Sequence, residues 1–65
     1  MTRSTLRNYQ VKVKEMDKMI QQMRKLADGL RGKAYGIQVV ERNLDRISAN
    51  IKMLEINVSD VRDLL

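Results

Sequence analysis

Apolar residues follow one another at alternating intervals of three and four along the first half of the chain. The series is Leu6, Tyr9, Val13, Met16, Ile20, Met23, Ala27 and Leu30. This spacing is the seam of a heptad repeat, which places its members on one stripe of an α-helix. The pattern predicts a helix over about residues 4–30.

A second series with the same spacing follows in the other half. Its members are Ile37, Val40, Leu44, Ile47, Ile51, Leu54, Val58, Val61 and Leu65, and they predict a second helix over about residues 37–65. The chain has only two aromatic residues, Tyr9 and Tyr35, and no Pro, a composition that favours helix over sheet. We therefore expect an all-α fold and a single domain over residues 1–65.

All three glycines of the chain, Gly29, Gly32 and Gly36, lie near the junction of the two series. A glycine inside a helix costs about 1 kcal/mol relative to alanine, whereas glycine is the preferred residue just past a helix C-terminus. We therefore expect a turn over about residues 31–36. The two helices would then form an antiparallel hairpin.

Facing residues of an antiparallel hairpin have position numbers with a constant total. The pairs that join the two apolar series, from Leu30 with Ile37 to Leu6 with Val61, all total 67. This register matches apolar with apolar residues at every level and leaves a turn of ordinary length. It is the register that the sequence predicts.

An alternative seam runs through the glycines almost without interruption. It consists of Met16, Met19, Met23, Leu26, Leu30, Lys33, Ile37, Val40 and Leu44, with Lys33 as its one polar member. One long helix that dimerises as a coiled coil would use this seam. The three glycines favour the hairpin over this rod.

The first predicted helix has an apolar face wider than a two-residue seam, because Met19 and Leu26 add a third stripe. A face of this width is typical of a helix in a bundle. We therefore expect two hairpins to pair into a homodimeric four-helix bundle. The expected oligomerisation seam consists of Leu6, Tyr9, Val13, Met16, Ile20, Met23, Leu30, Ile37, Leu44, Ile47, Ile51, Leu54, Val58 and Val61.

The composition excludes most catalytic chemistry. Cys and His are absent, which excludes disulfides, thiolate chemistry, the common zinc sites and triads built on imidazole. The carboxylates are scattered over the predicted helix surfaces, so we expect no enzyme, no cofactor and no metal site. The longest uncharged stretch, residues 34–40, is far shorter than the ~20 apolar residues that span a bilayer. We expect a soluble, cytoplasmic protein.

Positive charge is concentrated in the first half. Residues 1–33 hold nine Lys or Arg against three Asp or Glu, a net of +6, while residues 34–65 hold four against five, a net of −1. Arg7, Lys14, Lys18 and Lys25 lie opposite the seam and would form a stripe about 27 Å long. Such a stripe suits a nucleic-acid backbone or an anionic membrane surface. The alternative is a solvated face built from good helix formers.

Two further groups lie on the second helix. Asn43, Asn50 and Asn57 recur every seven residues and would form a ladder of amides that fixes the register between chains, or else occupy a polar boundary position. Ala49, Met53 and Ile56 cluster away from the seam and predict a surface for another protein or for widening the oligomer to a tetramer.

Taken together, these patterns indicate a small self-associating interaction or assembly module without catalytic activity. Its first partner would be a second copy of the chain, and a further partner could be another helical protein. A nucleic-acid-binding regulator that uses the basic stripe is the alternative from a different class, and peripheral attachment to an anionic membrane is the third.

Overall fold

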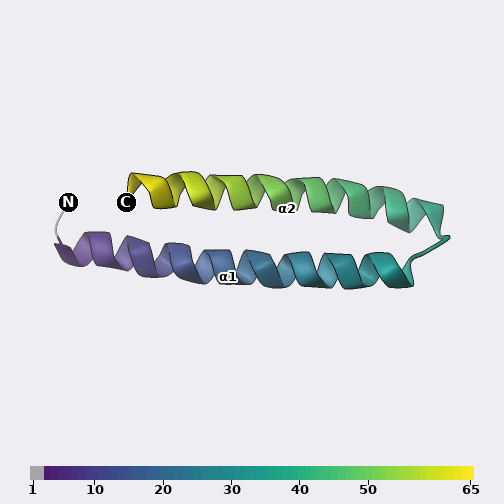
Figure 1. Cartoon of the computed structure of the whole chain (residues 1–65), viewed down its shortest axis with the longest axis horizontal. Coiled ribbons are helices and arrows are strands. Elements are labelled where there is room, and N and C mark those ends of the chain that lie inside the picture. Colours follow the sequence, from purple (N-terminus) through teal and green to yellow (C-terminus); the bar gives the residue numbers. More distant parts are fainter. Residues whose placement is uncertain (1–2) are drawn as a thin grey trace.

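The computed structural model describes residues 3–65, and this part of the chain forms two α-helices and no strand. Helix α1 runs Arg3–Lys33 and helix α2 runs Gln38–Leu64. The helices lie side by side in opposite directions and are joined at one end by a short turn (Figure 1). The expected all-α antiparallel hairpin is confirmed, and the chain is not one continuous helix.

The chain reverses over residues 34–37, so α1 is longer than the expected 4–30 and includes Gly29 and Gly32. The amide of Ala34 still donates a helical hydrogen bond of 2.9 Å, and the amide of Ile37 then closes the turn on the Ala34 carbonyl at 2.8 Å. Gly36 has a φ of +87°, in the left-handed region that favours glycine. One glycine therefore makes the turn, and the other two are accommodated within the helix.

The start of α2 is held by a backbone-to-side-chain hydrogen bond. Ile37 precedes the helix and offers no side-chain cap. The amide of Gly36 instead donates to Oε1 of Glu41 at 2.6 Å, and the Glu41 amide bonds to the Ile37 carbonyl at 3.0 Å. A carboxylate in the first turn also interacts favourably with the positive end of the helix dipole. Glu41 therefore links the turn to α2.

The buried core is a single file of residues at every seventh position of each helix. Leu44 and Ile51 are the most buried, each with 2% of its surface exposed. Leu65 packs against this core from the end of α2. The fully buried residues are Val13, Ile20, Ala27 and Ala34 in the first half and Leu44, Ile51 and Val58 in the second.

The two helices pair in a different register from the expected one. The expected register, in which facing positions total 67, is wrong. The polar contacts between the helices join positions whose numbers total 76 to 79 instead of 67: Arg24 with Glu55, Asp17 with Arg62, Gln21 with Glu55, and Arg31 with Asp45. The difference of 9 to 12 residues corresponds to about 14 to 18 Å along the helix axis. Part of this difference arises because α1 continues through two glycines, which moves the turn toward the C-terminus, and Ala34 becomes buried in the core.

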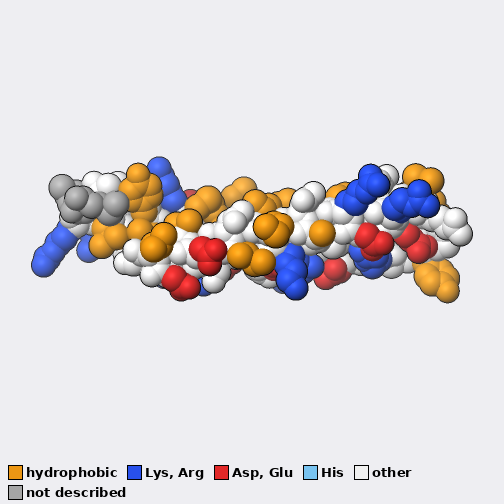
Figure 2. Space-filling view, turned by 90° about the horizontal axis from the view of Figure 1, so that it is seen from above, with side chains coloured by type: hydrophobic (Ala, Val, Ile, Leu, Met, Phe, Trp, Pro, Cys, Tyr) orange, Lys and Arg blue, Asp and Glu red, His pale blue; other side chains and the backbone are white. Residues whose placement is uncertain are grey.

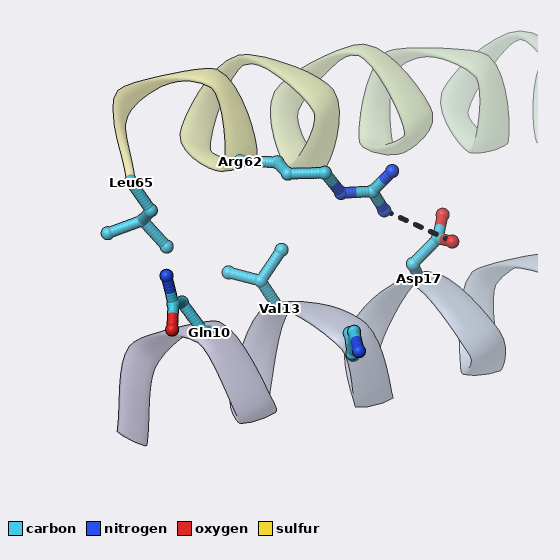
Figure 3. A pocket seen from close by; sticks show the side chains of 6 residues that line it. Gln10, Val13, Asp17, Arg62 and Leu65 are labelled. Carbon is cyan, nitrogen blue, oxygen red and sulfur yellow. Dashed lines mark ion pairs between the residues drawn. The ribbon is translucent and has the colours of Figure 1, made fainter. Parts of the chain in front are cut away.

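A consequence of this register is that α1 extends past the C-terminal end of α2 (Figure 1). Leu65, at the end of α2, lies beside Gln10 and Val13 (Figure 3), and Arg62 pairs with Asp17, so Leu6 does not face Val61. The hairpin measures 52 × 15 × 12 Å. Its radius of gyration of 15.4 Å exceeds the ~11 Å typical of a compact domain of this length. Neither helix carries an apolar stretch long enough to cross a lipid bilayer.

Candidate interaction surfaces

One long edge of the hairpin is closed by polar contacts between the helices. Arg24 binds Glu55 at 2.6 Å, Arg31 binds Asp45 at 2.8 Å, and Asp17 binds Arg62 at 3.2 Å. The α1 members of these pairs, Asp17, Arg24 and Arg31, each lie four residues after a core position. That spacing places them on the flank of the core that faces the corresponding flank of α2. We call this side the ion-paired edge.

Glu55 is the centre of the ion-paired edge. Its carboxylate accepts hydrogen bonds from both Nε and Nη2 of Arg24, at 3.4 and 2.6 Å, and from the amide of Gln21 at 3.0 Å. The Arg24 guanidinium, with help from Gln21, lowers the pKa of Glu55 below its ordinary value of 4.5. The same hydrogen bond raises the pKa of Arg24. The pair is therefore charged at neutral pH.

The opposite edge of the hairpin is apolar and uncovered. Met19 is 63% exposed and Leu26 75% exposed, and between the helices this side is hollowed into a groove of about 250 Å³. Residues of both helices line the groove, including Met23 and Leu30 of α1 and Ile47 of α2. We call this side the open face. Its exposed residues are Met16, Met19, Met23, Leu26, Leu30, Ile47, Leu54 and Val61.

The residues of the expected oligomerisation seam separate into two groups. Five of them are buried within a single hairpin, namely Val13, Ile20, Leu44, Ile51 and Val58. Leu6 is half-buried. The remaining members are exposed: Tyr9, Met16, Met23, Leu30, Ile37, Ile47, Leu54 and Val61. Between Val13 and Val58 the first position of each heptad therefore holds the two helices together, except at Ile37 beside the turn, and the second position is exposed.

Two core residues were missed by sequence reasoning. Ala34 lies at the start of the turn, as the sequence predicted, but it is buried there, with 4% of its surface exposed. The signal was present, because Ala34 lies seven residues after Ala27 and continues the same stripe. Leu65 belonged to the second apolar series but had no partner in the expected register, and it packs near Val13.

The four cations of the predicted basic stripe, Arg7, Lys14, Lys18 and Lys25, are all exposed. None of them forms an ion pair with another residue that the structure describes. A hollow of about 320 Å³ lies beside Lys14, where α2 ends against α1, and Asp17 and Arg62 pair across it (Figure 3). Asp17, the acidic residue between Lys14 and Lys18, is therefore neutralised by Arg62 of α2, so the basic stripe keeps its positive charge.

The two groups predicted on α2 are also at the surface. Asn43, Asn50 and Asn57 are exposed and make no hydrogen bond to any side chain that the structure describes. Ala49, Met53 and Ile56 lie on the outer face of α2, away from α1, and Met53 is 55% exposed. Figure 2 looks down on this face and shows hydrophobic side chains gathered in its middle.

Within residues 3–65, no group of three His, Cys, Asp or Glu side chains could hold a metal ion. The carboxylate of Glu55, whose pKa is lowered, is hydrogen-bonded to Arg24 and Gln21. The described part of the chain also contains no buried polar side-chain atom without a hydrogen-bond partner. No protein-family model, curated protein or solved structure matches the chain.

Proposed function

We propose that the protein is a self-associating helical hairpin that serves as an interaction or assembly module without catalytic activity. A second copy covers the open face, and the two hairpins form a four-helix bundle. The observation that carries this proposal is the open face itself, where Met23, Leu26 and Ile47 line an apolar groove between the helices. Monomeric proteins rarely leave so continuous an apolar surface in water.

The surface area of the chain supports this proposal. Its accessible surface is 5606 Å². A folded monomer of 7.6 kDa is expected to expose about 4300 Å², so the hairpin has an excess of about 1300 Å². A standard protein interface buries about 800 Å² on each partner. One additional copy is therefore enough to bring the exposed surface to an ordinary value.

The small core supports the same proposal. Only the single file from Val13 to Val58 is fully buried, and three of its members, Val13, Ala27 and Ala34, are small. Chains of this size rarely gain more than a few kcal/mol from one core. A second layer built from the open face would bury the larger Met, Leu and Ile side chains. Assembly would then supply much of the free energy of folding.

The test is a double substitution on the open face, Met19→Gln with Leu26→Gln. Both residues are exposed in the single hairpin, so the change leaves intrachain packing intact but places polar groups inside the bundle. We expect the particle mass in sedimentation equilibrium to fall by half. The matched control is Val11→Gln, which alters an exposed apolar residue on the outer side of α1. An unchanged mass for the double variant would contradict the proposal.

A second candidate function, nucleic-acid binding, is favoured by the basic stripe. Its four cations are exposed and unpaired within the described residues, and the chain carries a net charge of +5. If each neutralises one phosphate, the slope of log affinity against log salt should be about −3.6 on duplex DNA. Affinity would then fall roughly 150-fold between about 50 and 200 mM salt.

Replacement of Arg7, Lys14, Lys18 and Lys25 by Gln should flatten this salt slope and leave the helical signal unchanged. The matched control replaces Arg42, Arg46 and Lys52 of α2 by Gln. An equal loss in the control would mean that only general basicity is measured. Binding of the same proteins to anionic vesicles separates attachment to a membrane from recognition of a duplex.

A further inference from the structure

The outer face of α2 carries a third stripe with heptad spacing. Its members are separated by alternating intervals of four and three, so they lie on one line along the helix. We call this line the outer stripe. From the turn toward the C-terminus it contains Arg42, Arg46, Ala49, Met53, Ile56, Asp60 and Asp63.

The outer stripe is ordered by charge along its length. Two arginines, Arg42 and Arg46, occupy the end near the turn, and two aspartates, Asp60 and Asp63, occupy the other end. The apolar cluster lies between them. Figure 2 looks onto this face of α2 and shows basic side chains next to acidic ones toward the turn, hydrophobic ones in the middle and acidic ones toward the C-terminus.

All residues of the outer stripe are exposed. Met53 and Ile56 are 55% and 44% exposed, so α1 leaves much of both in water. The interhelical ion pairs use Asp45, Glu55 and Arg62 of α2, and none uses a charge of the outer stripe. The four charges of the stripe therefore remain available to a partner.

We propose that the outer stripe is a second self-association surface, which binds the outer stripe of another copy with α2 running antiparallel to α2. The sequence of charges is self-complementary only in this direction. An antiparallel pair brings the arginines of each copy to the aspartates of the other, whereas a parallel pair would oppose like charges. A two-fold axis makes every such contact occur twice.

The spacing of the stripe fits this symmetry closely. In an antiparallel pair, Arg42 lies level with Asp63 of the second copy, and Arg46 lies level with Asp60 of the second copy. Ala49 lies level with Ile56, so a small residue faces a larger one. The position numbers of these pairs total 105 or 106, which places Met53 at the two-fold axis. The contact is about 31 Å long, measured from residue 42 to residue 63.

The flanks of the pair are compatible with the same register. Asn50 comes close to Asn57 of the second copy, where the two amides can exchange hydrogen bonds. This contact would give two members of the predicted asparagine ladder a role between chains. On the other flank, Lys52 approaches Lys52 of the second copy. These two like charges lie at a solvent-exposed edge, where water and salt screen their repulsion.

This surface is separate from the open face and does not depend on it. The open face follows the core on the side away from the ion pairs, and the outer stripe lies on the far side of α2 from α1. Copies joined through both surfaces form tetramers of about 30 kDa or longer assemblies. Copies joined through the outer stripe alone form dimers of about 15 kDa.

Charge reversal tests the outer stripe. The first variant, Arg42→Glu with Arg46→Glu, and the second, Asp60→Lys with Asp63→Lys, each turn four attractive pairs into four repulsive ones. We expect the dissociation constant of this contact to rise roughly 100-fold in either variant at about 50 mM salt. Sedimentation velocity over a concentration series measures it. Circular dichroism checks that the helices are retained.

Mixing the two variants provides the decisive measurement, because an antiparallel heterodimer restores all four attractive pairs. We expect the mixture, and a single chain that carries all four substitutions, to regain the wild-type particle mass. The control is Lys14→Glu with Lys18→Glu, which makes the same change in net charge as the first variant, at the same spacing, on the outer side of α1. Its mass should equal that of the wild type.

The outcomes separate this inference from the proposed function. A loss from tetramer to dimer on charge reversal supports both surfaces, and a loss from dimer to monomer supports the outer stripe but contradicts the open face. Unchanged mass in both reversed variants would overturn the outer stripe, as would failure of the mixture to recover. Equal loss in the Lys14 and Lys18 control would also overturn it.

Discussion

Of the three glycines within eight residues, two are helical and one has a positive φ, and this difference predicts opposite effects of alanine on stability. Gly29 and Gly32 are helical, and a Cβ at either would meet no atom within 4 Å. Gly29→Ala and Gly32→Ala should therefore each raise the free energy of unfolding by about 1 kcal/mol. Gly36 has a positive φ, so Gly36→Ala should lower it by about 1 kcal/mol. Urea denaturation measures all three.

The sign of the effect at Gly36 also separates the hairpin from a continuous rod. In a rod, Gly36 would be a helical residue and alanine would stabilise it in the same way as at Gly29 and Gly32. A gain in stability for Gly36→Ala would therefore contradict the observed turn.

At Glu55 the structure predicts a dependence of stability on pH. The lowered pKa of Glu55 means that its ionised form is favoured by folding, so the stabilisation is present above the ordinary value of 4.5. It is lost as the pH falls through the lowered pKa in the folded protein. We expect Glu55→Gln to be less stable than the wild type at neutral pH and to lose less stability on acidification. Thermal melts in a pH series measure this effect.

The same pH experiment has an internal control in Arg24. Since the Arg24 guanidinium is the main cause of the lowered pKa, Arg24→Gln should weaken the pH dependence in the same direction. Gln21→Ala should have a smaller effect, because Gln21 is the weaker of the two causes. Superimposable pH profiles for wild type, Glu55→Gln and Arg24→Gln would contradict this interpretation.

At the scale of the helices, the sequence predicts that the two helices pair, but it does not predict the register in which they pair. The two apolar series identify both helices and the hairpin. Because each series repeats every seven residues, several registers match apolar with apolar residues. The choice among them depends on which residue turns the chain, and three neighbouring glycines leave that choice open. Only the backbone conformation of Gly36 decides it.

For the candidate surfaces, the sequence predicts which residues are exposed, but it does not predict which side of the seam faces the other helix. The exposure of the basic stripe and of the cluster at Ala49, Met53 and Ile56 follows from their distance from the seam, which depends on helix periodicity alone. The division of the seam into buried and open positions follows instead from the relative rotation of the helices. Arg24 and Glu55 reveal this rotation in the structure, because their ion pair marks the closed edge. Helix periodicity in a single sequence does not determine it.

Cysteine pairs distinguish the two registers directly. Ala27 and Ile51 belong to the same buried cluster and line the same groove, so Ala27→Cys with Ile51→Cys should form an intramolecular disulfide on mild oxidation. The control is Leu6→Cys with Val61→Cys, which belongs to the register that totals 67 and places the two positions about 16 Å apart along the axis. Mass spectrometry of dilute samples distinguishes bridged monomers from crosslinked dimers. A disulfide within one chain of the control would favour the other register.

At the scale of the whole molecule, the hairpin is long and thin, and its surface is large for its mass. If folding depends on assembly, dilution should destabilise the protein. We expect the melting temperature to fall by about 5 °C for each tenfold dilution, from mass action on a dimer of this size. Calorimetry or circular dichroism over three decades of concentration measures this shift. A constant melting temperature would show that one hairpin is stable alone.

The position of the turn has a consequence for how the length of such a protein can change. Register is set at Gly36, and the same buried level recurs every seventh residue on both helices. Insertion or deletion of whole heptads far from the turn would therefore leave every contact near the turn in place. Removal of one or two residues from the turn would instead change every pair along the hairpin. Variation in chain length should accordingly be tolerated at the end where α1 extends past α2 and excluded between Lys33 and Gln38.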